Sequence, residues 1–318
     1  PLNHVSIMQR LDVIDTEQGA LVSGSRGYYM KGKLVMLNLA LIQYALEYLS
    51  KRGFTPFYTP FFMNQSIMGK VAQLSQFDEE LYHVSGSGIH EDKYLIATSE
   101  QPLCAVHMKS TIYPKQLPIK MAGISTCFRK EAGTHGKDTL GIFRVHQFEK
   151  VEQFCITNPT EGKSWEMFHE LIGNSEEFYQ SLDIPYRVVS IVSGKLNDAA
   201  ALKYDLEAWF PASQTYRELV SCSNCTDFQS RRLDILYGGS KKKGADREFV
   251  HMLNCTLSAT SRTLCCIVEN YQGTNDEGVE GVFVPKALQK FVGTEFLPYV
   301  QDLKVVKKKS KKKSKQKK

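Results

Sequence analysis

The sequence lacks an apolar run long enough to cross a bilayer, since a membrane-spanning helix needs about 20 consecutive apolar residues. The strongest candidate, residues 34–49, is interrupted by Asn38, Gln43 and Glu47, and this spacing is typical of an amphipathic helix. No signal peptide opens the chain, and its first residue is Pro1 rather than methionine. We therefore expect a globular protein whose natural N-terminus is missing or processed.

Paired cysteine motifs are scarce. Eight cysteines are scattered through the chain, and "CSNC" at 222–225 is the only CxxC among them. A structural zinc site takes four ligands, usually from two such pairs, and a redox motif would need a thioredoxin-like context. Without a secretory signal, a disulfide framework is not expected either. We expect the cysteines to be reduced thiols in the core.

Glycine-rich phosphate loops of the usual kinds are also absent. "SGSG" at 85–88 lacks a third spaced glycine and a following helix, and "YGGSKKKG" at 237–244 is not a Walker loop. Both stretches are expected to be surface turns. If the protein binds a nucleotide, other groups must hold the phosphates.

Charge is unevenly distributed. The net charge is +6, but ten lysines and no acidic residue fall in residues 304–318, so the rest of the chain carries −4. A lysine block of this kind cannot pack into a core, and we expect a disordered tail. Its charge suits RNA phosphates or nuclear import, and a solubilising run without a specific partner explains it equally well.

The remaining composition is that of an ordinary globular protein, with 318 residues of which 42% are hydrophobic and 23% charged. Residues 33–52 and 164–182 have the apolar spacing of helices. The strand-like runs are "YRVVSIVSG", "YDLEAWFP", "QTYRELVSCSN" and "FVHMLN". Strands in runs between long helices predict an α+β architecture, with an antiparallel sheet flanked by helices. No repeat or shift in composition divides residues 1–303, which we expect to form one domain.

Two strand-like stretches between residues 127 and 154 have an unusual polar face. One face of the second stretch carries Arg144, His146, Phe148, Lys150, Glu152 and Phe154. We expect Arg129 and Glu131 to share a face of the neighbouring strand. Guanidinium groups suit phosphate or carboxylate oxygens, a phenyl ring offers a stacking surface, and carboxylates accept hydrogen bonds. This face therefore suits a nucleotide plus a small zwitterion, although an exposed ladder of ion pairs would have the same pattern.

Three further segments favour the binding site. In "TSE", an extended conformation would put Thr98 and Glu100 on one side, where they suit an ammonium group. In "LNCTLSATSRT", Asn254 and Thr256 share a strand face, and Arg262 lies on the helix that follows.

The third segment, "RELVSCSN", contains Glu218 and Ser221, which are oxygen ligands of the kind that Mg²⁺ prefers. A regular strand would point these two side chains to opposite faces. We therefore expect a bulge or a strand end between them.

Taken together, these segments resemble the catalytic domain of the eukaryotic cytosolic-type seryl-tRNA synthetases, a family of class II aminoacyl-tRNA synthetases. "FTPFYTPFFM" is similar to motif 1 of that class with Pro60 as its proline, and residues 128–154 are similar to motif 2. The segment 254–262 is similar to motif 3. The resemblance covers residues 1–303 and implies an enzyme that activates serine with ATP and transfers it to tRNA(Ser), with tRNA(Sec) as a further substrate.

The resemblance also implies roles in the ATP site. Arg129 would grip the α-phosphate together with the serine carboxylate. Phe148 and Arg262 would enclose the adenine, and Glu131 would contact its amino edge. Arg144 and Arg262 would hold the outer phosphate of a bent ATP. By the same resemblance, the catalytic residues are Arg129, Glu131 and Arg262.

On the other side of the predicted site, Glu218 and Ser221 would hold Mg²⁺. The serine substrate would lie among Thr98, Glu100, Arg129, Glu152, Asn254 and Thr256. His146 and Lys150 share the polar face but receive no role, and contacts with ATP phosphates and purely structural roles both remain open for them.

The family has an N-terminal helical arm that binds tRNA, and this chain begins where that arm should have ended. We expect it to form seryl-adenylate but to charge tRNA poorly. The resemblance further implies a cytoplasmic homodimer, with Pro60 shaping the dimer interface, and a loop at 133–141 that lies near the tRNA end.

Two other functions compete with this one. A class II synthetase for threonine would need a zinc site, and the sequence offers no suitable ligand set. An inactive, RNA-binding or regulatory paralogue would be expected to have lost the motif arginines or the metal-binding acid, and all of these are present.

Overall fold

The computed structural model describes residues 1–72, 77, 79–86, 91–132, 140–239 and 244–302. The lysine-rich tail and most of the loop at 133–141 lie outside these residues, as do parts of "SGSG" and "YGGSKKKG". Among the described helices, none is both long and apolar enough to cross a membrane.

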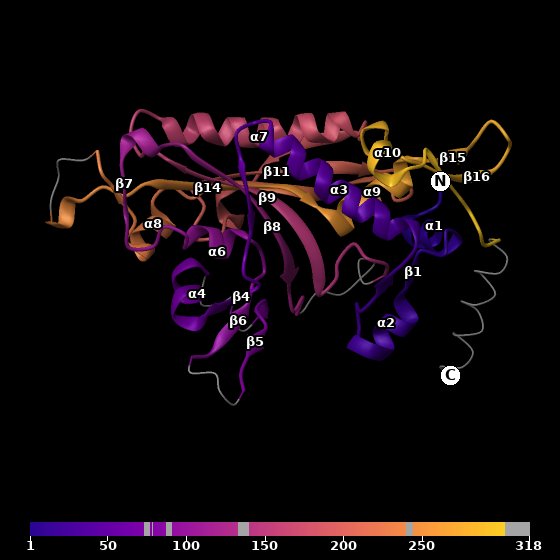
Figure 1. Cartoon of the computed structure of the whole chain (residues 1–318), viewed down its shortest axis with the longest axis horizontal. Coiled ribbons are helices and arrows are strands. Elements are labelled where there is room, and N and C mark those ends of the chain that lie inside the picture. Colours follow the sequence, from indigo (N-terminus) through magenta and orange to yellow (C-terminus); the bar gives the residue numbers. More distant parts are fainter. Residues whose placement is uncertain (73–76, 78, 87–90, 133–139, 240–243, 303–318) are drawn as a thin grey trace.

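A seven-stranded sheet forms the centre of the molecule (Figure 1), in the order β10-β11-β12-β14-β9-β8-β3. Its strands are β3 (Thr55–Tyr58), β8 (Ile119–Phe128), β9 (Gln147–Thr157), β10 (Tyr186–Ser190), β11 (Leu202–Phe210), β12 (Thr215–Asn224) and β14 (His251–Ala259). All neighbours are antiparallel except β3, which pairs with β8 in parallel at the edge. Pro56 lies within β3, and an edge strand tolerates proline because one side of it needs no partner.

Three longer helices pack against this sheet, and they are α3 (Lys33–Ser50), α7 (Lys163–Ser181) and α9 (Thr260–Asn270). Odd-numbered side chains of β9 face α3 and α7. Asn38 donates to Glu149 at 2.7 Å, and the Gln153 amide donates to the carbonyl of Leu171 at 3.0 Å. Because side chains alternate along a strand, the even-numbered residues of β9 point to the opposite face of the sheet, away from these helices.

Shorter elements complete the fold. Near the N-terminus they are α1 (His4–Arg10), β1 (Ile14–Asp15), α2 (Thr16–Ser23) and β2 (Tyr29–Met30). Below the sheet in Figure 1 are β4 (Phe62–Asn64), α4 (Gln65–Val71), β5 (His83–Val84), β6 (Lys93–Leu95) and α6 (Glu100–Cys104). The others are β7 (Thr111–Ile112), α8 (Phe228–Leu233), β13 (Leu236–Tyr237), β15 (Gln272–Thr274), β16 (Glu280–Phe283), α10 (Lys286–Val292) and β17 (Phe296–Pro298).

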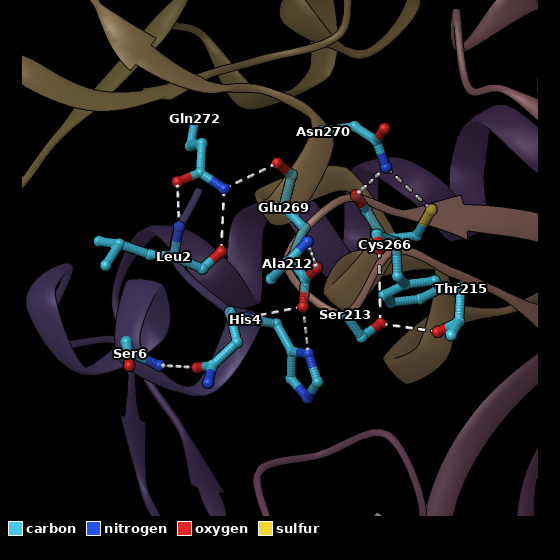
Figure 2. Close-up of polar contacts among 12 residues, drawn as sticks. Leu2, His4, Ser6, Ala212, Ser213, Thr215, Cys266, Glu269, Asn270 and Gln272 are labelled. Carbon is cyan, nitrogen blue, oxygen red and sulfur yellow. Dashed lines mark hydrogen bonds and ion pairs between the residues drawn. The ribbon is translucent and has the colours of Figure 1, made fainter.

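The first residues of the chain are anchored to the end of α9 (Figure 2). One oxygen of the Glu269 carboxylate accepts hydrogen bonds from the backbone N–H of His4 at 2.9 Å and from its ring Nδ1 at 2.7 Å. The other oxygen accepts from the backbone N–H of Ala212 at 3.2 Å. Gln272 adds two hydrogen bonds to the backbone of Leu2. Glu269 thus ties together α1, α9 and the turn between β11 and β12.

Several sequence-based expectations can be compared with this fold. The helices expected at 33–52 and 164–182 and the four later strands are confirmed. All eight cysteines are free and buried, as expected for core thiols. The extended conformation expected for "TSE" is wrong, because Ser99 has helical dihedral angles and α6 begins at Glu100. Strand β9 begins at Gln147, so Arg144 and His146 precede the strand on which they were expected.

Candidate active site

A cavity of about 340 Å³ opens on the face of the sheet opposite α3 and α7. Its volume lies within the range of small-molecule sites. All twelve residues predicted from the sequence line it. They are Thr98, Glu100, Arg129, Glu131, Arg144, Phe148, Glu152, Glu218, Ser221, Asn254, Thr256 and Arg262. These residues are separated by up to 164 positions in the chain, from Thr98 to Arg262, and the fold brings them to one place.

Strand β9 supplies the floor of the cavity. Phe148, Lys150 and Glu152 point into it from the even-numbered face of the strand, and the latter two side chains are 7% and 2% exposed. The alternation continues to Phe154, which is fully buried in a separate apolar cluster beyond the cavity. The polar face that the sequence predicted therefore becomes apolar where the cavity ends.

Two arginines lie next to the ends of strands, with Arg129 directly after β8 and Arg144 shortly before β9. The Arg129 guanidinium carbon is 5.4 Å from the centre of the Phe148 ring, which is a distance for cation–π contact. Arg144 forms an ion pair with Glu131 at 3.0 Å. Glu131 has a φ of 51°, a left-handed conformation that no regular strand contains, so the expected shared strand face of Arg129 and Glu131 is wrong. His146 holds the same segment through its ring Nδ1, 2.9 Å from the carbonyl oxygen of Arg129.

One end of the cavity is built around Glu152. Its Oε2 oxygen accepts hydrogen bonds from the hydroxyl groups of Thr98 and Ser99 and from the backbone N–H of Glu100 at 3.2 Å. Its Oε1 oxygen accepts from Lys150 Nζ at 2.9 Å. Burial by itself would raise the pKa of Glu152, but Lys150 and these hydroxyl donors outweigh it and hold that pKa below its usual range.

The neighbouring carboxyl group of Glu100 behaves in the opposite way. Burial, followed by the negative charge of Glu152, raises the pKa of Glu100 to about 7. The amide of Gln229 donates to Glu100 Oε1 at 2.8 Å, which partly offsets the rise. A buried carboxyl group that gains or loses its proton near neutral pH is a feature of functional sites.

The wall next to Glu152 comes from β14. Asn254 and Thr256 lie on one face of this strand and are 7% and 6% exposed, and Thr256 pairs with Glu152 across the sheet. The Nδ2 atom of Asn254 donates a weak hydrogen bond to the sulfur of the buried Cys225 at 3.8 Å.

The opposite wall contains the bulge that the sequence predicted. In the pairing of β11 with β12, Glu207 faces Glu218 and Leu206 faces Val220, so Leu219 is the extra residue. The bulge brings both Glu218 and Ser221 to the cavity.

Another acidic residue, Asp205, pairs with Ser221 across β11 and β12 but does not line the cavity. Burial, followed by the charge of Glu218, raises the pKa of Asp205 to about 6. Its buried Oδ1 oxygen forms an ion pair with Lys203 Nζ at 3.4 Å. Within the cavity, the carboxylate of Glu218 and the hydroxyl group of Ser221 are the oxygen ligands that suit a hard divalent cation.

Arg262 lies at the start of α9 and reaches the same wall. Its Nη1 donates to the carbonyl oxygen of Glu218 at 3.2 Å and lies 3.6 Å from the carboxylate of that residue. Its guanidinium carbon is 5.1 Å from the centre of the Phe143 ring. Phe143 was missed in the sequence because its neighbours in the motif carry the obvious polar signals.

Other lining residues were missed as well, and among them are Asn197, Lys203, Ser223 and Ser261. Lys203 and Ser223 face each other across β11 and β12, and Ser261 directly precedes Arg262. Alternation along β12 from Ser221 could have indicated Ser223. Nothing local in the sequence distinguishes Asn197, which lies between β10 and β11.

Comparisons with known proteins agree with this geometry. The family model of the tRNA synthetase class II core domain (G, H, P, S and T) matches residues 82–271. The cytoplasmic serine–tRNA ligase of Arabidopsis thaliana is 61% identical over 298 residues, which make up 93% of this chain and 64% of that protein. This chain therefore spans just under two thirds of the length of that relative.

Two solved structures are similar to the whole described fold. The cytoplasmic serine–tRNA ligase from Naegleria fowleri, in complex with AMP, matches with a TM-score of 0.90 and 62% sequence identity. The match covers 94% of this chain and 68% of the Naegleria chain. Seryl-tRNA synthetase from Pyrococcus horikoshii, complexed with ATP, has a TM-score of 0.87 and 44% identity and covers 95% of this chain and 65% of its own. Both are bound to an adenine nucleotide.

Proposed function

The chain belongs to the cytoplasmic-type seryl-tRNA synthetases of class II, and from this premise we propose that it activates serine with ATP and transfers it to tRNA(Ser) in the cytoplasm. The observation that carries the proposal is the single cavity lined by all twelve predicted residues. The relatives named above bear the same activity in their names, and two of them are complexes with AMP and ATP.

ATP would occupy the part of the cavity between Phe148 and Arg262. Phe148 offers a ring for the adenine, with the guanidinium group of Arg262 on its other side, and Glu131 would accept a hydrogen bond from the adenine amino group. Arg144 and Arg262 would hold the outer phosphate. The ion pairs that these arginines form with Glu131 and Glu218 support this role, because they keep each guanidinium group oriented.

Serine would occupy the end built around Glu152. Glu100 and Thr98 suit the ammonium group, Arg129 suits the carboxylate, and Glu152 suits the hydroxyl group. Asn254 and Thr256 would close this end from β14. A site built to hydrogen-bond a hydroxyl group strongly rejects a substrate that lacks it, because its buried polar groups are then left without partners.

The first reaction needs no covalent intermediate with the protein. A carboxylate oxygen of serine attacks the α-phosphorus of ATP, the bond to the bridging oxygen breaks, and pyrophosphate leaves with the electron pair. Arg129 would contact both the α-phosphate and the serine carboxylate, and its positive charge would reduce the repulsion between the two anions. Catalysis would then consist of positioning and of electrostatic stabilisation by fixed arginines.

Mg²⁺ fits the wall formed by Glu218 and Ser221. The carboxylate of Glu218 and the hydroxyl group of Ser221 support a cation there, because both are oxygen ligands and line the same wall of the cavity. When bound, the ion would supply positive charge next to the pyrophosphate leaving group.

In the second reaction, a ribose hydroxyl group at the 3′ end of tRNA takes serine from the adenylate and AMP leaves. The part of the loop at 133–139 that would approach this end lies outside the described residues. Transfer to tRNA(Sec) and poor charging of tRNA by this span of chain stay predictions.

A homodimer is part of the proposal. Large apolar side chains are exposed on α2, on β2 and on the first half of α3, and they are Leu21, Val22, Tyr29, Met36 and Leu39. Because contiguous exposed apolar surface is a feature of protein interfaces, these side chains are candidates for the contact between two copies of the chain. Pro60, which is also exposed, stays a candidate for that interface.

The proposal is tested by pyrophosphate exchange into ATP with each of the amino acids in turn, beside a charging assay with tRNA(Ser). Exchange that depends on serine is the expected result. Exchange with another amino acid, or with none, would contradict the proposed activity.

A further inference from the structure

Lys150 is a buried cation in the floor of the cavity that the proposed mechanism does not use. Its side chain is 7% exposed, and among the described residues its one hydrogen-bond partner is Glu152 Oε1, at 2.9 Å. A buried ammonium group is unfavourable unless it is paired with a negative charge, and here the Glu152 carboxylate supplies that charge.

The two oxygens of Glu152 have different surroundings. Oε2 already accepts three hydrogen bonds, from Thr98, Ser99 and the backbone of Glu100. Within the described part of the chain, the hydrogen bond to Oε1 comes from Lys150 alone. A carboxylate oxygen can accept more than one hydrogen bond, so Oε1, with one donor, retains capacity for a group that enters the cavity.

We propose that Lys150 is a specificity-determining residue, which fixes the Oε1 oxygen of Glu152 as the acceptor for the hydroxyl group of serine. This inference rests on the proposed function and adds to it the group that makes the hydroxyl contact selective. Lys150 acts through Glu152 and is therefore a positioning residue.

The charge of Lys150 matters as well as its hydrogen bond. Glu152 is faced by the carboxyl group of Glu100 from α6 and by Lys150 on its own strand, and the guanidinium group of Arg129 acts on Glu100. The thiols of Cys104 and Cys127 lie near the same carboxylate. Without Lys150, burial and the negative charge of Glu100 would both favour the protonated form of Glu152. A protonated carboxyl group can donate a hydrogen bond, so it would no longer act only as an acceptor for the serine hydroxyl group.

The experiment compares Lys150→Met with the unchanged protein in pyrophosphate exchange, with serine and with alanine. Rates are normalised to active sites that form the adenylate. We expect kcat/KM for serine to fall about 10- to 100-fold, the usual effect of losing a hydrogen bond that involves a charged group. Both amino acids are compared at pH 8.5, above the acid limb that Glu100 causes for either ammonium group. There the value for alanine should change less than about threefold, because alanine brings no hydroxyl group to Glu152.

Two further variants sharpen the result. Lys150→Gln keeps a donor without the charge and should give an intermediate loss, and it carries the test if Lys150→Met does not fold. In the Glu152→Gln background, Lys150→Met should have little further effect on serine, since the acceptor is already changed.

The matched control is Lys120→Met. Lys120 on β8 forms a similar pair with Glu170 of α7 at 2.6 Å, outside the cavity. Serine and alanine activation should both be unchanged in this variant. The acid limb of kcat/KM for serine should also move to higher pH in Lys150→Met and stay in place in Lys120→Met, because Lys150 lowers the pKa of both Glu152 and Glu100.

Three outcomes would overturn the proposal. If kcat/KM falls equally for serine and alanine in Lys150→Met, Lys150 has a structural role. If only the KM for ATP rises, Lys150 contacts a phosphate group. If no kinetic constant changes, Lys150 has no role in activation. If the unchanged protein shows no exchange with serine, the proposed function fails together with this inference. If the unchanged protein shows exchange with serine, and the ratio of kcat/KM for serine to that for alanine is the same in Lys150→Met, only the role of Lys150 is contradicted.

Discussion

The backbone N–H of Glu100 donates to the Oε2 oxygen of Glu152 at 3.2 Å, so two carboxyl groups share one buried wall of the cavity. Their pKa values move apart, since burial and the charge of Glu152 raise the pKa of Glu100 to about 7 while the pKa of Glu152 is lowered. Two adjacent acids with different protonation states suit two different groups of one substrate.

The first prediction concerns pH. Glu100 must be ionised to attract the ammonium group of serine, and its ionised fraction rises with pH through its pKa. We therefore expect kcat/KM for serine to rise about tenfold per pH unit below pH 7 and to level off above it. The measurement is pyrophosphate exchange at limiting serine between pH 5.5 and 8.5. Glu100→Gln should lower the rate and remove this limb, and an unchanged profile in that variant would assign the limb to another group.

The second prediction concerns the hydroxyl group of serine. Glu152→Gln keeps the shape of the side chain but replaces an anionic acceptor with a neutral amide next to Lys150. We expect kcat/KM for serine to fall at least about 100-fold and alanine to be affected far less. Exchange assays with both amino acids measure the ratio. A variant that still prefers serine as strongly as the unchanged protein would refute this role of Glu152.

The third prediction concerns Arg262. Arg262→Lys keeps the positive charge but loses the planar group that lies over Phe143 and donates to Glu218. A lysine cannot replace a stacked, forked donor, so we expect kcat/KM for ATP to fall about 10- to 100-fold.

Arg187 provides a matched control for this variant. It pairs with Glu207 at 2.6 Å and lies 4.5 Å from the ring centre of Tyr216, in the same kind of arrangement, but it does not line the cavity. Arg187→Lys should leave the kinetics for ATP unchanged. Similar losses in both variants would point to a general effect on the fold.

The fourth prediction concerns stability. Glu269→Ala removes the acceptor of three hydrogen bonds that anchor α1 and the β11–β12 turn to α9. We expect the free energy of unfolding to fall by about 3–5 kcal/mol, as for other broken buried pairs. Urea denaturation measures it. Glu166→Ala breaks an exposed pair with Lys163 and should cost less than about 1 kcal/mol, so equal losses would contradict the anchoring role.

The sequence predicted the elements that depend on local pattern. Their apolar spacing predicted the helices α3 and α7. The separation of Glu218 and Ser221 predicted a bulge or a strand end between them, and the structure has a bulge at Leu219. The polar face of β9 suggested a binding site but left an exposed ladder of ion pairs open, and the full set of cavity residues followed from the resemblance to a known family.

The errors lie where tertiary contacts override the local pattern. The stretch before β9 alternates like a strand, but regular pairing with β8 ends at Gln147, and Arg144 and His146 instead make side-chain contacts with Glu131 and with the carbonyl oxygen of Arg129. "TSE" turns into α6 because its hydroxyl groups and the N–H of Glu100 all bind Glu152, 52 residues later in the chain. The parallel pairing of β3 with β8 depends on a long crossover that no local signal specifies.

The central claim is that this cavity activates serine, and pyrophosphate exchange into ATP measures that reaction directly and without tRNA. Exchange that requires serine and Mg²⁺, that alanine does not support at a comparable rate, and that Arg129→Ala abolishes is the predicted result. Exchange that is absent with serine, or that persists unchanged in Arg129→Ala, would contradict the account.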